Sequence, residues 1–165
     1  MTKTLNDLLL TMMQDVYYAE RQILKALPKM AKATESEELK QALMHHREET
    51  EGQVERLQKA FEALGKRARG KTCEVIDALV EEGEEVIEEF PAGIVRDAGI
   101  LAGAQAVEHY EMARYGTMVA WAKVCGADQV AKLLHETLEE EKKADSLLNE
   151  LAKKSINQEA MSQAA

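Results

Sequence analysis

Apolar residues recur every three or four positions along four long stretches of the chain, and this spacing places them on one face of an α-helix. The predicted long helices cover residues 4–33, 36–64, 92–124 and 128–154. Thr4, Ser36 and Asp128 are residue types that cap helix N-termini, and Gly65 and Gly126 are typical of the position after a helix ends. A short turn joins the helices of each pair, so we expect two antiparallel helical hairpins.

A shorter amphipathic helix is predicted between the hairpins, over residues 72–89, with Thr72 as its cap and Pro91 after its end. Its second face carries a run of glutamates between residues 81 and 89, which is typical of a solvated face. The basic segment 65–71 precedes it, and without a strand or a glycine-rich fingerprint a solvated loop is a better interpretation than a phosphate site. The predicted fold is all-α, a four-helix bundle of two antiparallel hairpins with a long crossover that carries an additional helix.

Carboxylates interrupt the apolar stripes of the long helices. One face of the stretch 101–118 consists of Leu101, Ala104, Glu108, Glu111, Tyr115 and Met118. Acidic residues also stand where apolar residues are expected on the other three helices, at Glu20, Glu49, Glu141 and Asp145. Burying several like charges together is very costly unless they are protonated or neutralised by a cation.

The hairpin geometry brings these carboxylates to one level of the bundle. Glu20 and Glu49 are equidistant from the first turn, and Glu111 and Glu141 are equidistant from Gly126 in the second. In both hairpins this distance is roughly 21–24 Å along the helix axis at 1.5 Å per residue. If the hairpins pack face to face, all the carboxylates meet in one layer.

Three interpretations of this layer compete. A single glutamate on an apolar stripe is commonly a boundary residue whose head group reaches water. A buried salt-bridge cluster would need Lys or Arg on the facing stripes, and none stands near this level. A metal site accounts best for interruptions at the same height on four helices, and five or six carboxylates suit iron or manganese, with magnesium as a non-redox occupant.

Composition and charge narrow the function further. The net charge of -9 disfavours nucleic acid and anionic membrane surfaces as partners. No apolar run approaches the roughly 20 residues of a membrane span. The first residues lead into an amphipathic helix instead of a signal sequence, so we expect a cytoplasmic protein. Cys73 and Cys125 follow no metal or redox spacing, and we expect reduced thiols that pack in the fold.

Four blocks of sequence resemble one known family. They are Asp15-Val-Tyr-Tyr-Ala-Glu-Arg-Gln22, His46-Arg-Glu-Glu-Thr50, Glu108-His-Tyr-Glu111 with Tyr115-Gly116, and Leu138-Glu-Glu-Glu-Lys142. In this order they resemble the bacterial YciE/YciF family of stress-associated ferritin-like proteins, with a rubrerythrin-like di-metal site. The resemblance implies that residues 1–157 form a single ferritin-like domain that assembles as a homodimer. Residues 158–165 are expected to be a disordered tail.

The resemblance also implies a set of metal ligands. The residues that match the family's motif are Glu20, Glu49, Glu108, Glu111 and Glu141, with Asp145 as a substitute on the last helix. The chain departs from the pattern where histidine is usual, because Gly52 and Ala144 stand three residues after Glu49 and Glu141.

Several neighbours of the expected ligands have open roles. His46 and Gln53 are candidates for a ligand or for a hydrogen-bond partner of a ligand. His45, His109 and His135 are expected on the surface or in packing, and Tyr17 and Tyr115 in the core with hydroxyls bonded to carboxylates.

The expected function is binding of two iron or manganese ions, with turnover of oxygen or peroxide in stress protection. The alternative is a structural or partner-binding dimer with a weak or vestigial metal site. The departure from the histidine pattern favours the alternative, and the clustered carboxylates favour the first. A hollow iron-storage shell is the least favoured assembly.

Overall fold

The computed structural model describes residues 2–163, which are almost entirely helical. The helices are α1 (Leu5–Ala33), α2 (Glu37–Ala63), α3 (Glu74–Glu89), α4 (Ile94–Val124), α5 (Asp128–Leu151) and α6 (Asn157–Ser162), with a π-helical turn at Ala152–Ile156. The fold is the ferritin-like four-helix bundle that the sequence predicts, with α3 in the crossover between two hairpins.

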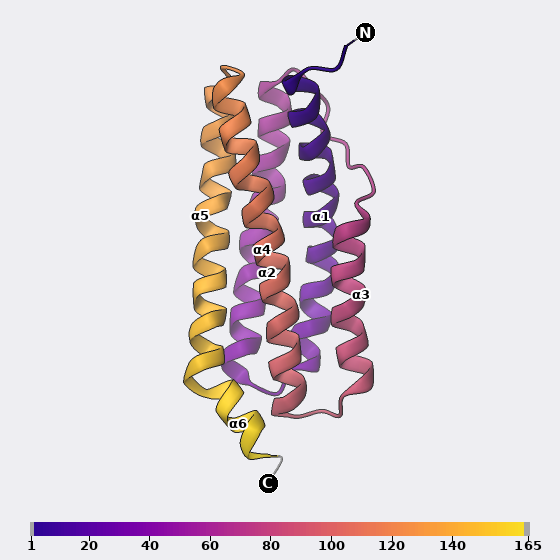
Figure 1. Ribbon diagram of the computed structural model, residues 1–165, viewed down its shortest axis with the longest axis vertical. Helices are drawn as coiled ribbons and strands as arrows, with labels where there is room; N and C mark the ends of the chain where they lie inside the picture. The colour runs from indigo at the N-terminus through magenta and orange to yellow at the C-terminus, as the bar shows by residue number, and fades with distance from the viewer. Residues whose placement is uncertain (1, 164–165) are drawn as a thin grey trace.

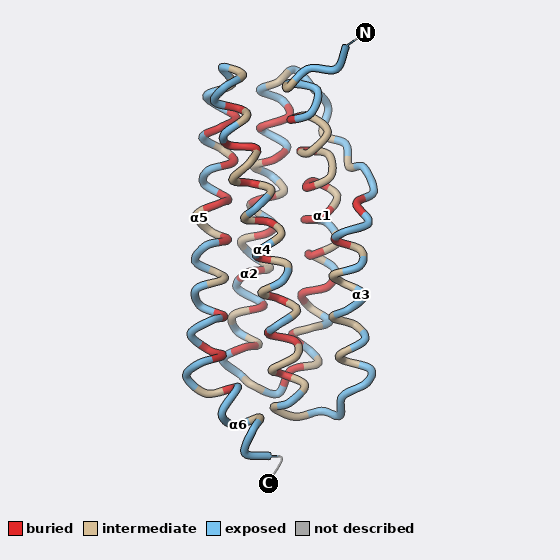
Figure 2. Tube along the Cα trace, viewed as in Figure 1, coloured by how far each residue is buried: buried red, intermediate tan, exposed pale blue. Residues whose placement is uncertain are grey.

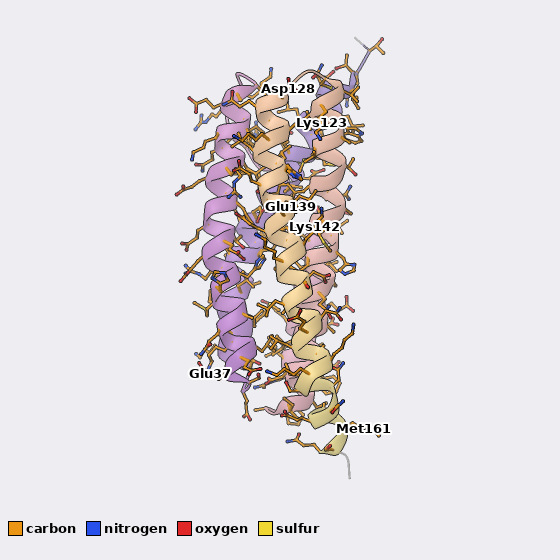
Figure 3. The ribbon with its side chains drawn as sticks, turned by 90° about the vertical axis from the view of Figure 1, so that its left-hand side faces the viewer. Glu37, Lys123, Asp128, Glu139, Lys142 and Met161 are labelled. Atoms are coloured by element: carbon orange, nitrogen blue, oxygen red, sulfur yellow. The ribbon has the colours of Figure 1, made fainter. Side chains whose placement is uncertain are left out.

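The four long helices form a closed square. Contacts join α1 to α2, α2 to α5, α5 to α4 and α4 to α1, while α3 contacts α1 and α4 and covers that side of the bundle. In Figure 1, α2 and α4 run in one direction and α1, α3 and α5 run in the other. The turns of the two hairpins therefore lie at opposite ends of the molecule, as Glu37 and Asp128 show in Figure 3.

Local sequence sets most of the helix ends. Thr4 forms a capping box with Asp7 at the start of α1, and the Ser36 hydroxyl accepts from the Leu39 amide at the start of α2. The predicted caps Thr72 and Asp128 are wrong by one residue, because Cys73 and Ala127 occupy these positions without a side-chain cap bond.

Asp97 ties the second hairpin to the first. Its buried carboxylate accepts hydrogen bonds from the backbone amides of Glu35 at 3.1 Å and Ser36 at 2.6 Å, at the turn between α1 and α2. Neighbouring Arg96 donates to the Ala33 carbonyl at 2.6 Å in the same turn. The first turn of α4 thus fixes the end of the α1–α2 hairpin through charge-assisted bonds.

The apolar core has two parts, and buried positions follow the inward sides of the helices in Figure 2. One cluster lies toward the α4–α5 turn and includes Met13, Phe61 and Met118. The other lies toward the α1–α2 turn and includes Ile23 and Ile100. The polar layer described below separates them.

The C-terminal segment differs from the expected tail. Residues 157–162 are helical, and α6 contacts α4. Ile156, which precedes α6, is buried in the second cluster and anchors the segment. The last two residues of the expected tail, 164 and 165, lie outside the described residues.

We predict that Asp97→Ala lowers the free energy of unfolding by about 2–3 kcal/mol, because it leaves two partly buried backbone amides without their charged acceptor. Asp128→Ala is the control, since Asp128 is exposed and provides no cap bond. Urea denaturation measures both variants. Equal, small losses would show that Asp97 does not hold the hairpins together.

Candidate metal centre

A layer of buried polar side chains crosses the middle of the bundle. Glu20, Glu111 and Glu141 have no solvent exposure, Glu108 is 2% exposed and His46 is 6% exposed. All four long helices contribute to this layer, with α4 supplying two residues one turn apart. The structure therefore brings together the interrupted stripes of four helices, as the hairpin geometry predicts.

Four of these residues surround one point. His46, Glu108, Glu111 and Glu141 each offer a ligand atom, and these atoms lie within 4.8 Å of one another. His46 Nε2 is 3.1 Å from Glu108 Oε1 and 3.8 Å from Glu141 Oε2. One imidazole and three carboxylates are a donor set that divalent iron or manganese accepts.

Glu20 adds a fourth carboxylate and is held by a tyrosine. The buried hydroxyl of Tyr115 donates a hydrogen bond to Glu20 Oε1, as expected for a core tyrosine beside a carboxylate. Tyr17 instead accepts from the Gln58 amide at 3.1 Å and packs edge-on against Phe61. Of these two tyrosines, Tyr115 alone forms a hydrogen bond with a carboxylate of the layer.

Most polar atoms of the layer lack a hydrogen-bond partner. Within residues 2–163, both carboxylate oxygens of Glu111 and Glu141 and both ring nitrogens of His46 are buried without one. Among these residues, too, no Lys or Arg forms an ion pair with Glu20, Glu108, Glu111 or Glu141. Leaving such groups unpaired costs far more than an ordinary hydrogen bond contributes, so the layer fits a bound cation.

The electrostatics of the layer favour proton uptake in the absence of metal. Burial raises the pKa of Glu20 to about 7, although the bond from Tyr115 opposes this. Burial and the neighbouring carboxylates raise the pKa values of Glu111 and Glu141 well above the ordinary value. Burial also raises the pKa of Glu108, despite the opposing influence of His46.

His46 takes part in the same proton balance. Burial lowers the pKa of His46, but the nearby carboxylates of Glu49, Glu108 and Glu20 outweigh burial and raise it. The layer can therefore hold protons when it holds no metal, and it must release them when metal binds.

Two of the expected ligands lie at the edge of the layer. Glu49 is partly exposed and lies 3.6 Å from both His45 Nε2 and His46 Nδ1. Asp145 is also partly exposed, and its Oδ1 lies 3.1 Å from His109 Nε2. Glu49 thus contacts the central group only through His46, and Asp145 contacts His109 outside it.

The buried face of α2 differs from the one that the sequence predicts. The buried α2 positions near the layer are His46, Thr50 and Gln53, so Glu49 lies beside the buried face of α2 rather than on it.

His46 lies inside the four-residue group, whereas Gln53 donates a hydrogen bond to Glu140 at 3.2 Å. The signal for His46 was its place on the apolar stripe one turn before Glu49. His45, His109 and His135 are exposed, as expected.

The chain matches one family model over residues 4–161, described as "Domain of unknown function (DUF892)". It is 44% identical over 163 residues to Protein YciF of Escherichia coli strain K12, covering 98% of both chains. Within residues 2–163, every helix is too short or too polar to span a lipid bilayer.

Solved structures share the same fold. The crystal structure of the E. coli stress protein YciF matches with a TM-score of 0.90 and 44% identity, over 94% of this chain and 99% of that one. YcfI of Rhodopseudomonas palustris, for which a structural role has been suggested, matches with a TM-score of 0.88 and 48% identity, over 89% and 94%. A Xanthomonas campestris protein at 21% identity shares the fold alone, with a TM-score of 0.76 over 98% and 100% of the two chains.

We predict that the metal-free protein loses stability as the pH rises from about 5 to 8. Between the ordinary value of 4.5 and about 7, Glu20 is protonated in the folded state and ionised in the unfolded state. The folded state then binds more protons than the unfolded state. The stabilisation that this proton gives is therefore present at low pH and is lost as the pH rises through the pKa of Glu20 in the folded state. Glu20 alone accounts for roughly 3 kcal/mol, at 1.36 kcal/mol per pKa unit.

Urea denaturation in the presence of a chelator measures this dependence. The raised pKa values of Glu108, Glu111, Glu141 and His46 act in the same direction as that of Glu20. Saturating metal provides the control, because metal binds the ionised carboxylates and should reverse the trend. A chelated protein that gains stability up to pH 8 would contradict the proton uptake.

Proposed function

The chain belongs to the DUF892 family, and from its buried carboxylate layer we propose that it is a ferritin-like protein that binds two iron or manganese ions and acts on oxygen or peroxide in stress protection. Its similarity to the E. coli stress protein YciF confirms the resemblance to the YciE/YciF family seen in the sequence and supports the stress role. The observation that carries the metal proposal is the set of buried, unpartnered glutamate oxygens.

Charge balance supports two divalent ions. The layer contains four glutamates, at positions 20, 108, 111 and 141, and a neutral His46 adds no charge. Two divalent cations would neutralise four ionised carboxylates, whereas one would leave a buried net charge at high cost. Oxygen-rich ligands favour iron or manganese, and magnesium is the non-redox occupant.

Each residue of the layer has a role in this proposal. His46, Glu108, Glu111 and Glu141 would hold metal around their common point, and Glu20 would complete the site from α1. When bound, redox-active ions supply the electrons that reduce oxygen or peroxide. Tyr115 orients Glu20 through its hydrogen bond, and burial keeps its hydroxyl protonated by raising its pKa well above the ordinary value. The two apolar clusters on either side exclude water from the layer.

A structural or partner-binding dimer with a weak site is the second candidate. Its supporting observations are the edge positions of Glu49 and Asp145, which leave fewer central ligands than the sequence predicts. The structural role suggested for R. palustris YcfI agrees with it. The homodimer and the cytoplasmic location belong to both proposals.

Anaerobic ferrous titration followed by exposure to oxygen or to peroxide distinguishes the two candidates. The di-metal proposal expects binding of about two ions per chain, as charge balance requires, and rapid appearance of oxo-ferric absorbance. Less than one ion per chain, with no oxidation, would support the structural protein instead.

We predict that Glu111→Gln reduces bound metal to less than half of the wild-type stoichiometry, because it removes a central ligand and one negative charge. At pH 8 the metal-free variant should unfold at higher urea concentration than the wild type, since it lacks a buried ionisable group. Elemental analysis after dialysis measures the first effect and urea denaturation the second.

Glu139→Gln is the matched control for this substitution. Glu139 lies on the outer face of α5, where it accepts from Lys142 at 2.7 Å (Figure 3). This variant should bind metal as the wild type does. Full metal content in Glu111→Gln would assign the ligands to other residues.

A further inference from the structure

A small cavity of about 30 Å³ lies beneath α3, between α1 and α4. Its exposed end is bordered by Lys29 and Glu84, which form an ion pair of 2.7 Å between α1 and α3. Its buried end is bordered by His46 and Glu108, two of the four residues of the central group. The residues that border the cavity therefore extend from the surface under α3 to the edge of the carboxylate layer.

The wall between these two ends is apolar. In the described part of the chain, every other lining residue is apolar or a glycine, among them Ile23, Leu79 and Val107. An ion or a strongly hydrogen-bonding molecule would lose its hydration in such a passage without compensation. A cavity needs roughly 10–15 Å³ to hold one water-sized molecule, so this one admits only very small guests.

Gly83 borders the cavity without a side chain. It lies in the middle of the apolar stripe of α3 that includes Val80 and Ile87, and all three border the cavity. A Cβ atom at Gly83 would meet no heavy atom within 4 Å, which means that the space beside this glycine is free. Glycine in a helix interior costs about 1 kcal/mol relative to alanine, so helix propensity does not favour it here.

The approach from the opposite side of His46 has a different chemistry. A second cavity of about 20 Å³ also reaches His46 and Glu108, but its border includes the ionisable side chains of His45 and Glu49. The cavity under α3 has no such group between its two ends among the described residues.

We propose that the cavity under α3 is a binding site for a small apolar molecule of the dioxygen class, and that dioxygen reaches the edge of the carboxylate layer through it. The role as an entry route rests on the proposed function, whereas the site itself does not. The molecule that enters by this route is then dioxygen rather than peroxide, because peroxide requires hydrogen-bond partners that this wall does not provide.

Xenon tests the site without any metal, since dry apolar cavities bind it. Crystals of chelator-treated protein under xenon pressure should show one xenon atom beside Ile23 and Val80. Gly83→Leu, whose side chain fills the cavity, should abolish this atom, and Val80→Phe provides a second filling variant. Gly116→Leu is the matched control, because Gly116 is a helical glycine with free space at its Cβ position and does not border the cavity. An empty cavity in the wild type would overturn the site.

Stopped-flow oxidation of the ferrous protein tests the route. Gly83→Leu should slow oxidation by dioxygen roughly tenfold and leave the rate with peroxide and the ferrous stoichiometry close to wild type. An unchanged dioxygen rate would overturn the route. So would a variant that fills the second cavity, Ala144→Leu, if it slowed the dioxygen reaction instead.

The two proposals fail in different ways. If the wild type binds neither iron nor manganese, the proposed function and the entry route are both wrong, and the xenon experiment still decides the apolar site. If iron binds and oxidises but no xenon binds under α3, the proposed function stands and the proposed apolar site is wrong.

Discussion

The cost of burying four glutamates in one layer is the constraint on which the rest of the structure depends. Glu20, Glu108, Glu111 and Glu141 lie where a helix bundle normally has leucine or valine, and they are shielded from water by apolar clusters above and below. Protons can neutralise them in part, as the raised pKa values of all four indicate. A metal ion neutralises them more completely, because it also satisfies the carboxylate oxygens that lack hydrogen bonds.

Apolar packing in the rest of the bundle offsets the free-energy cost of this layer. Two hairpins supply two apolar clusters, and Asp97 fixes the turn of one hairpin to the start of the other. The layer is thus assembled from four separate helices whose relative positions are set far from it. The added helix α3 does not contribute a ligand, and it covers the α1–α4 side and encloses the apolar cavity.

The sequence was sufficient to predict the helices, the hairpins and the level at which the carboxylates meet. Distance from a turn determines height along a bundle, so Glu20, Glu111 and Glu141 were placed correctly. It does not determine how far each helix is rotated about its axis. On α2 this rotation turns His46 and Thr50 inward and leaves Glu49 at the edge, although all three lie near the same height.

Asp145 illustrates a second limit of the sequence. Its position one residue after Ala144 suggested that it could replace a missing ligand, but the exposed His109 on the neighbouring helix contacts it at 3.1 Å. Such a pair depends on side chains that lie 36 residues apart in the chain. The cavity under α3 was also beyond the sequence, because it forms where Gly83 faces the α1–α4 side of the bundle.

The most direct test of the central claim is anomalous diffraction from crystals grown with Mn²⁺. The account predicts manganese peaks inside the bundle, about 2.0–2.6 Å from carboxylate oxygens of Glu108, Glu111 and Glu141 and close to His46. Peaks confined to surface glutamates, such as those between residues 81 and 89, would contradict it. In that case the buried layer would be a protonated structural feature of the fold rather than a metal centre.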